Sequence, residues 1–131
     1  TPTHLIRLAA MAAAGKLTAI DIFGDDYDTR DGTCIRDYIH VVDLASAIVS
    51  AVEMGPLFTD YECLGSNIGF SVREVINTMQ SVTGKTIKCN IVGRRPGDAV
   101  SSIVDNLSEY CNLTKTIEDM CLDQYNLEKE T

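Results

Sequence analysis

The sequence predicts a single α/β unit of mixed strands and helices over residues 1–131. Three observations predict this fold class. The length of 131 residues is that of one domain. The composition, with 45% hydrophobic and 23% charged residues, is that of an ordinary globular protein. Strand-like and helix-like segments also follow one another along the chain, with no Pro-rich or Ser-rich linker to mark a domain boundary.

A helix is predicted to begin at residue 1 and to stop at Gly15. Thr1 suits its N-cap and Pro2 its first turn, where the missing N–H of proline costs nothing. Four apolar residues at helical spacing are expected to form its buried stripe: Leu5, Leu8, Ala9 and Ala12.

Two strands are predicted next, over residues 17–23 and 34–42, on either side of an acidic, turn-rich loop. Asp43 is then expected to cap a helix that runs to Gly55. Five apolar residues predict the buried face of that helix: Leu44, Ala47, Ile48, Ala51 and Val52.

The second half of the chain contains a clear helix start. Ser71 and Glu74 have the spacing of a capping box, and Gly84 suits the end of the same helix. Its buried stripe is predicted to comprise Val72, Val75, Ile76 and Met79. The other predicted elements are a short strand at Cys63 and Leu64, a strand over 86–92, a turn over 93–98, and one or two helices around Ser108 and over 117–127.

Composition excludes several classes of function. Eleven Lys and Arg against nineteen Asp and Glu give a net charge of −8, so we expect neither a nucleic-acid partner nor an anionic membrane surface. The apolar run Leu8–Ala14 is too short to span a bilayer. The five cysteines are odd in number and lack a C-x-x-C pair, and the two histidines are far apart, so we predict no disulfide framework, no metal site and a cytoplasmic location.

The segment around Arg36 is a candidate ligand wall. Side chains alternate along a strand, so Arg36, Tyr38 and His40 are expected on one face. A guanidinium suits a phosphate oxygen, and a phenol suits a hydroxyl group or a ring. The alternative is structural, with the arginine paired to a loop aspartate and the tyrosine packed against the core.

The turn Arg94-Arg95-Pro96-Gly97-Asp98 is a second candidate. Pro96 and Gly97 favour a type II turn, which would bring Arg95 and Asp98 close together. Arginine suits a diphosphate and aspartate suits ribose hydroxyls, so the turn would fit a sugar nucleotide. The alternative is a surface turn in which Asp98 only neutralises an arginine.

Other catalytic and binding motifs are missing from these 131 residues. Within the acidic loop 25–32, Arg30 occupies the fifth position of the potential calcium motif, so we predict a solvated loop. No G-x-G-x-x-G loop follows a strand, and no G-x-S-x-G occurs. We therefore predict no catalytic residues in this chain.

Two segments, Ile22–Ala45 and Val92–Asp98, closely resemble the UDP-glucose 4-epimerases of the extended short-chain dehydrogenase/reductase family. The resemblance covers nearly the whole chain but only the C-terminal, substrate-binding portion of that enzyme. It implies that the Rossmann half, with its glycine loop and Tyr-x-x-x-Lys pair, is missing. It further implies NAD as the cofactor of the intact enzyme, with none bound by this chain alone. The implied partners are a UDP-hexose and either an N-terminal Rossmann half or a homodimer partner.

The resemblance also implies roles for individual residues. Asp21, Ile22 and Phe23 would lie against the uracil. Arg36 and Arg95 would hold the diphosphate, with Tyr38 supporting Arg36 and Asp98 meeting the ribose. Ser102 stands where a small residue leaves room for an N-acetyl group. The full set of implied substrate-binding residues is Asp21, Ile22, Phe23, Arg36, Tyr38, Arg95, Pro96, Gly97, Asp98 and Ser102.

The implied activity is the interconversion of UDP-glucose and UDP-galactose in galactose metabolism, extended to UDP-GlcNAc and UDP-GalNAc. The isolated chain is expected to be inactive, because the hydride acceptor and the base belong to absent residues. Its apolar surface toward the missing half should be exposed and should promote self-association. The alternatives are a fragment of a nucleotide-sugar dehydratase or decarboxylase, and a noncatalytic module that binds a UDP-sugar or a partner chain.

Two positions depart from the family pattern. Asn67 replaces a glycine, and asparagine tolerates positive φ less freely. Leu113-Thr-Lys115 replaces Leu-Gly-Trp, so the C-terminal helix is expected to pack loosely.

Overall fold

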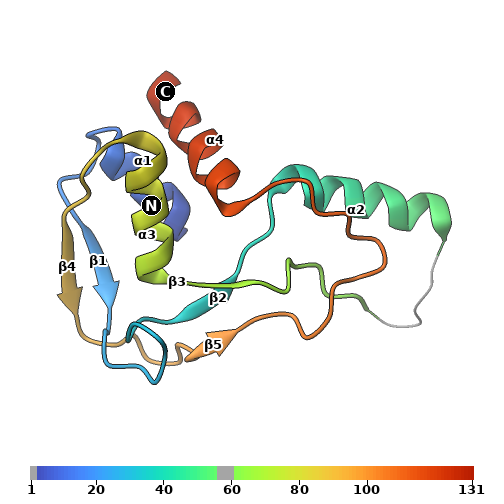
Figure 1. Cartoon of the computed structure of the whole chain (residues 1–131), viewed down its shortest axis with the longest axis horizontal. Helices are drawn as coiled ribbons and strands as arrows, with labels where there is room; N and C mark the ends of the chain where they lie inside the picture. Colours follow the sequence, from blue (N-terminus) through green and yellow to red (C-terminus); the bar gives the residue numbers. More distant parts are fainter. Residues whose placement is uncertain (1–2, 56–60) are drawn as a thin grey trace.

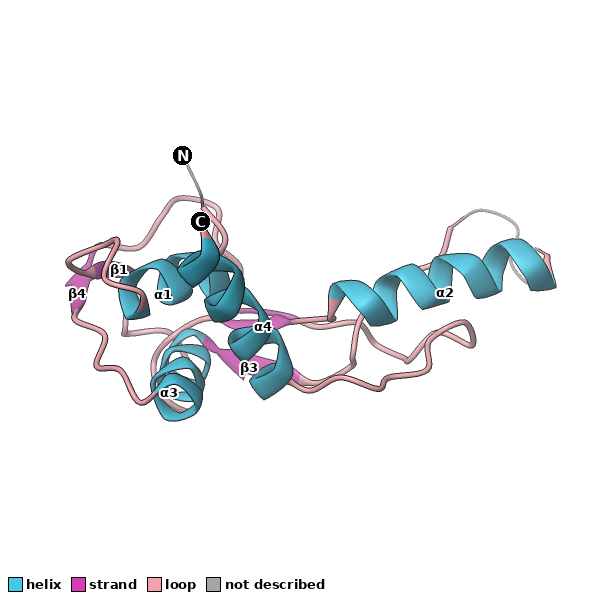
Figure 2. Ribbon diagram, turned by 90° about the horizontal axis from the view of Figure 1, so that it is seen from above, coloured by secondary structure: helices cyan, strands magenta, loops and turns pink. Residues whose placement is uncertain are grey.

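The computed structural model describes residues 3–55 and 61–131, which form the predicted α/β arrangement. Figure 1 shows the helices α1, α3 and α4 gathered at one end and α2 extending away from them, and Figure 2 shows the same separation from above. The elements in chain order are α1 (Leu5–Ala13), β1 (Ile20–Phe23), β2 (Ile35–Asp37), α2 (Val41–Met54), β3 (Gly69–Ser71), α3 (Val72–Thr83), β4 (Cys89–Val92), β5 (Ser101–Ser102) and α4 (Ile117–Glu130).

The described strands form two small sheets. β1 and β4 pair in parallel, with Phe23 opposite Val92. In the second sheet β2 is central, antiparallel to β3 and parallel to β5, so that Arg36 lies opposite both Phe70 and Ser102. The two sheets bring the loops after β1 and β4 close to β2.

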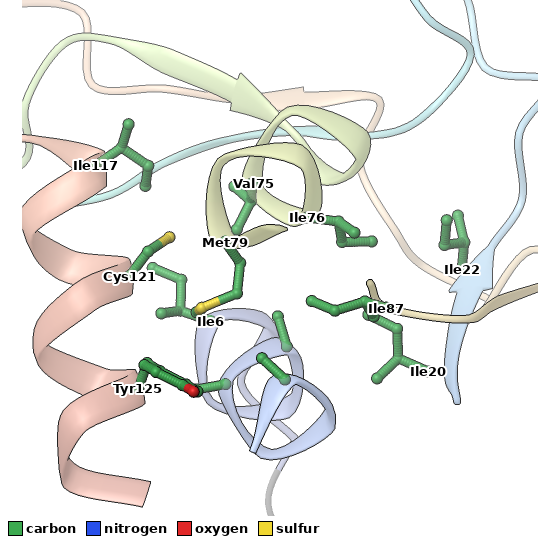
Figure 3. Packing of buried hydrophobic residues seen from close by; sticks show 13 residues of the cluster. Ile6, Ile20, Ile22, Val75, Ile76, Met79, Ile87, Ile117, Cys121 and Tyr125 are labelled. Atoms are coloured by element: carbon green, nitrogen blue, oxygen red, sulfur yellow. The ribbon is translucent and has the colours of Figure 1, made fainter. Parts of the chain in front are cut away.

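The core lies where α1, α3 and α4 meet β1 and β4 (Figure 3). Val75, Ile76 and Met79 on α3 are buried, as the stripe predicted, and Val72 packs against them partly buried. The α3 capping box is confirmed: Ser71 Oγ accepts from the Glu74 amide at 3.1 Å, and Glu74 Oε2 accepts from the Ser71 amide at 2.8 Å. Gly84 ends the helix in the left-handed conformation.

Helix α1 begins later than predicted. The expected cap residues Thr1 and Pro2 lie outside the described residues, and His4 is extended, so the helix starts at Leu5. The buried residues are Ile6, Ala9, Ala10 and Ala13, which rotates the stripe by about one residue from the prediction. Leu5 and Leu8 instead line the cleft described below. The apolar side chains of this helix are therefore divided between the core and the cleft.

Helix α2 departs from the prediction at its start. The strand before it ends at Asp37, and His40 is the N-cap, with Nδ1 accepting a hydrogen bond from the Val42 amide at 3.0 Å. The predicted cap Asp43 lies in the first turn and is buried. It accepts hydrogen bonds from Thr114 and Lys115 instead, because the chain before α4 passes beside it.

The apolar face of α2 is mostly exposed, which corrects the predicted buried face. Of the five residues in that prediction only Ala47 is buried, and the exposed fractions of Ile48 and Val52 are 52% and 79%. The helix runs away from the α1, α3 and α4 core in both views (Figures 1 and 2). The periodicity therefore marks an apolar face that the described part of this chain does not cover.

Two further predictions are wrong: the strand at Cys63 and Leu64, and the loose packing of the C-terminal helix. No strand forms at Cys63 and Leu64, and the described chain there joins α2 to β3 as a loop. Of the one or two helices predicted around Ser108 and over 117–127, one forms, α4, and it packs against the core rather than loosely. Ile117, Cys121 and Tyr125 of α4 are buried in the core, because they recur on one helical face.

Candidate functional site: an arginine-lined cleft

A cleft of about 920 Å³ opens where β1, β2, the turn after β4 and the helices α1, α2 and α4 approach one another. Six of the predicted site residues line it: Asp21, Phe23, Arg36, Tyr38, Arg95 and Asp98. They come from separate elements that only the folded chain brings together.

The two predicted diphosphate ligands meet at one carboxylate. Arg95 Nε donates to Asp98 Oδ2 at 3.0 Å, and its Nη2 donates to Asp98 Oδ1 at 3.4 Å. Arg36 Nη2 lies 3.8 Å from the same Oδ1. Two guanidinium groups therefore share one carboxylate. The ion pairs expected by the structural alternative are present as well, so the geometry alone fits both interpretations.

The predicted tight turn is present and fixes the spacing of Arg95 and Asp98. Gly97 has a φ of +83°, as the third residue of a type II turn requires, and the Asp98 amide donates to the Arg95 carbonyl at 3.4 Å. Pro96 and Gly97 are exposed and do not line the cleft. Their observed role is to shape the turn.

Strand β1 presents alternate residues to the cleft. Asp21 and Phe23 face it, whereas Ile22 is only 2% exposed and points into the core (Figure 3). The guanidinium carbon of Arg95 lies 4.5 Å from the centre of the Phe23 ring. Of the predicted contacts with a base, Ile22 could supply main-chain atoms only.

Ser102 lies beside the cleft without lining it. It is exposed on β5 and pairs with Arg36 across the sheet, so both side chains stand on one face. The predicted contact between Ser102 and a substrate would therefore be made at the border of the cleft.

Tyr38 and His40 line the cleft but are held as neutral or fully bonded groups. Burial raises the pKa of Tyr38 to about 12, although nearby Arg36 acts to lower it, so the phenol stays protonated at neutral pH. His40 Nδ1 accepts from the Val42 amide, and Nε2 lies 3.0 Å from Asp123 Oδ2. Neither ring nitrogen is left to act as a base in the cleft.

Asp37 is a residue of the site that the sequence analysis missed. Its carboxylate accepts from the Ser66 amide at 2.7 Å, the Ser66 hydroxyl at 2.6 Å, the Asn67 amide at 3.0 Å and the Val104 amide at 3.2 Å. It joins two loops to β2 beside Arg36. Asn67 has a φ of +58°, in the left-handed region that glycine adopts most freely. The replacement of glycine by asparagine therefore falls at a position that does require positive φ. No local motif signals these bonds.

Most residues of the acidic loop are exposed or partly exposed, as the prediction of a solvated loop expects, but the loop is also tied to α3. Asp31 accepts hydrogen bonds from the hydroxyls of Ser71 and Thr33, and Thr33 is fully buried. Arg30 Nε donates to Glu74 Oε1 at 2.6 Å. These bonds lower the pKa of Glu74, chiefly through Arg30. The loop is part of the framework that supports the cleft.

Arg94, the neighbour of Arg95, has a structural role. It stacks on Tyr27 at 4.1 Å and donates to Asp26 Oδ1 at 2.8 Å, outside the cleft. Gly24 must be a glycine here, because it has a φ of +87° and a Cβ would lie 2.7 Å from Arg94 Cγ. The pair of arginines is thus split between a structural anchor and a cleft residue.

No group of three His, Cys, Asp or Glu side chains in residues 3–55 and 61–131 could hold a metal ion. None of the helices described in the structure has both the length and the apolar character needed to cross a bilayer.

Comparison with known proteins identifies the family. Residues 1–63 match the model of the NAD dependent epimerase/dehydratase family. A UDP-glucose 4-epimerase of Bacillus subtilis (strain 168) is 38% identical over 95% of this chain, which spans 38% of that protein.

Two solved structures have the same fold. That of a UDP-glucose 4-epimerase from Stenotrophomonas maltophila, with bound NAD and formylated UDP-arabinopyranose, has a TM-score of 0.91 and 37% identity over 99% of this chain and 40% of its own. That of a UDP-Glc/GlcNAc 4-epimerase from Campylobacter jejuni has a TM-score of 0.83 and 39% identity over 100% of this chain and 42% of its own. The chain thus spans about two fifths of the length of these relatives. It belongs to the NAD-dependent epimerase/dehydratase family, where its similarity is to the C-terminal part of the UDP-glucose 4-epimerases.

Proposed function

We propose that this chain forms the UDP-sugar-binding part of a UDP-glucose 4-epimerase that interconverts UDP-glucose and UDP-galactose in galactose metabolism. The observation that carries the proposal is the convergence of Arg36 and Arg95 on Asp98 within one cleft. Two guanidinium groups against one carboxylate suit a diphosphate, which carries more negative charge than Asp98 alone. The UDP-sugar bound by the S. maltophila relative supports the same ligand class.

Each cleft residue then has a defined task. Arg36 and Arg95 bind diphosphate oxygens, and Asp98 exchanges part of its contact with them for a ribose hydroxyl. Asp21 and the main chain of β1 lie along the uracil. Tyr38 packs beside Arg36, is protonated at neutral pH and can donate one hydrogen bond.

NAD belongs to the remainder of the intact enzyme. The residues of this chain do not fit it, because no glycine-rich loop follows a strand to receive its pyrophosphate. We therefore propose that the chain binds substrate but is inactive alone, and that an N-terminal Rossmann half or a homodimer partner completes it. Five thiols without a disulfide suit a reducing compartment, and we propose the cytoplasm.

A UDP titration of the isolated chain, followed by NMR, tests the proposal. Arg36→Ala and Arg95→Ala should each weaken UDP binding by about tenfold, because each removes a charge-assisted bond to phosphate. Arg73→Ala is the matched control, since Arg73 pairs with Asp25 outside the cleft. The absence of UDP binding by the folded chain, or an equal loss in all three variants, would contradict the proposed site.

The sugar range is a finer part of the proposal. A serine at position 102 beside Arg36 leaves space at the border of the cleft, and the C. jejuni relative is a UDP-Glc/GlcNAc enzyme. We propose that this chain accepts UDP-GlcNAc as well as UDP-glucose. Ser102→Tyr should then weaken binding of UDP-GlcNAc and leave that of UDP-glucose nearly unchanged. Equal affinities of the variant for both ligands would refute this assignment.

The second candidate function is a noncatalytic module that binds a UDP-sugar or a partner chain. The exposed apolar face of α2 favours it, because such a face calls for a partner. The two candidates differ when the missing half is supplied, since only the epimerase part would then restore turnover.

A further inference from the structure

We infer that Phe23 positions Arg95 for the diphosphate by holding the guanidinium group over its ring. The inference rests on the proposed function and gives the Phe23 side chain a task other than contact with the base. The evidence for it is that Asp98 and Phe23 contact the Arg95 guanidinium group from two sides.

The backbone at Arg95 is held in place by the residues on both sides of it. Phe23 and Val92 end two paired parallel strands, so the turn after β4 starts beside the Phe23 ring. The preceding residue, Arg94, is held by Tyr27 at 4.1 Å and by Asp26 at 2.8 Å. The turn that follows is closed by the hydrogen bond from the Asp98 amide to the Arg95 carbonyl. Only the side chain of Arg95 remains to be placed.

Two neighbours place that side chain. Asp98 takes one edge of the guanidinium group, through Nε at 3.0 Å and Nη2 at 3.4 Å. Phe23 lies against its face, with 4.5 Å between the guanidinium carbon and the ring centre. A cation over a ring is attracted by the negative face of the π system, and this attraction does not use a hydrogen-bond donor. The Nη1 edge therefore stays available for a phosphate oxygen.

The stack matters because Arg95 is otherwise loosely held. Its side chain is 54% exposed, whereas that of Arg36 is 29% exposed. When a ligand draws Asp98 toward a ribose hydroxyl, the ring becomes the remaining support of the guanidinium group. A ring occupied by Arg95 also cannot offer that same face to the uracil. Phe23 is thus a positioning residue that acts through Arg95.

Three ligands separate this role from contact with the base: UDP, uridine and inorganic pyrophosphate, each titrated by NMR. If Phe23 acts through Arg95, Phe23→Leu should weaken UDP and pyrophosphate by about two- to fivefold, the effect expected of one exposed cation–π contact, and should leave uridine unchanged. Phe23→Tyr keeps a ring and should restore affinity. Tyr61→Leu, at an exposed position outside the cleft, controls for the loss of an aromatic residue.

A direct readout checks the stack without any ligand. The Arg95 Nε–H signal should be displaced by the ring current of Phe23 in the wild type and in Phe23→Tyr, and should return toward the position of an exposed arginine in Phe23→Leu. In an Arg95→Ala background, Phe23→Leu should cause no further loss of pyrophosphate affinity.

The outcomes separate the positioning role of Phe23 from the existence of the UDP site. An unmoved Arg95 signal in Phe23→Leu, an equal loss for uridine and UDP, or an undiminished effect in the Arg95→Ala background would overturn the positioning role and leave the UDP site standing. Failure of the wild-type chain to bind either UDP or pyrophosphate would overturn the site itself.

Discussion

Replacing Asp43 by alanine should lower the free energy of unfolding by about 2 kcal/mol. Asp43 is 2% exposed, and it joins the first turn of α2 to the segment that precedes α4. It accepts from the Thr114 hydroxyl at 2.6 Å, the Thr114 amide at 3.1 Å and the Lys115 amide at 3.0 Å. Together with the contact between His40 and Asp123, this carboxylate connects the start of α2 to the end of the molecule that holds the core.

The magnitude follows from these bonds. A hydrogen bond to a charged acceptor contributes about 1.5–3 kcal/mol net. The sum over all three bonds would therefore exceed the loss in free energy of unfolding that we expect for Asp43→Ala. Thr114 and Lys115 are exposed, however, so water can replace part of the bonding when the carboxylate is removed. Asp43→Asn keeps one acceptor oxygen and should lose about 1 kcal/mol.

The same carboxylate should make stability depend on pH in the acid range. Burial alone would raise the pKa of Asp43, but the Thr114 hydroxyl and the two amides outweigh it and hold the pKa below its usual value. A depressed pKa means that the folded state binds the proton less tightly than the unfolded state. The stabilisation is therefore complete above the unfolded pKa of about 4 and is lost as the pH falls through the folded pKa.

Urea denaturation followed by circular dichroism, at neutral pH and at several values below about pH 4, measures both effects. Asp105→Ala is the matched control, because Asp105 is exposed. Asp43→Asn should also flatten the acid dependence. A loss at neutral pH no larger than that of Asp105→Ala would refute the reasoning, as would an acid dependence identical to that of the wild type.

Three further predictions test the framework around the cleft. Gly24→Ala should cost about 1–2 kcal/mol and weaken UDP binding, because it forces positive φ on a side chain that meets Arg94; an unchanged melting temperature and affinity would contradict this. Ser71→Ala should cost about 1 kcal/mol in urea denaturation, because Glu74 and the start of α3 lose a cap; the expectation fails if the midpoint does not move. Val52→Asp, on the exposed face of α2, should reduce self-association in sedimentation velocity without changing UDP affinity, and a wild-type chain that stays monomeric at all concentrations would show the expectation wrong.

The features that could be predicted from the sequence are those built from neighbours in the chain. The capping box of Ser71 and Glu74 joins residues three apart, and Gly84 ends the same helix for reasons local to its backbone. The turn of Pro96 and Gly97 likewise needs only adjacent residues. Such signals survive in isolation, because their partners are always within reach.

The predictions that failed depended on distant partners. The helical spacing on α2 is real, but whether its apolar face is buried depends on what packs against it, and the described chain leaves Val52 exposed. His40 caps the helix in place of Asp43, because the Asp43 carboxylate accepts hydrogen bonds from Thr114 and Lys115 instead. No property of the residues next to Asp43 indicates these bonds.

For the candidate site, the sequence by itself determined the chemistry on offer: two arginines, a turn that pairs one of them with Asp98, and a resemblance that points to a UDP-sugar. The tertiary structure alone decided that Arg36 shares that carboxylate, that Arg94 faces away toward Tyr27, and that Phe23 lies under Arg95. The physical reason is that residue type fixes which bonds a side chain can make. Strand pairing and helix packing decide which of its possible partners lie near enough to make them.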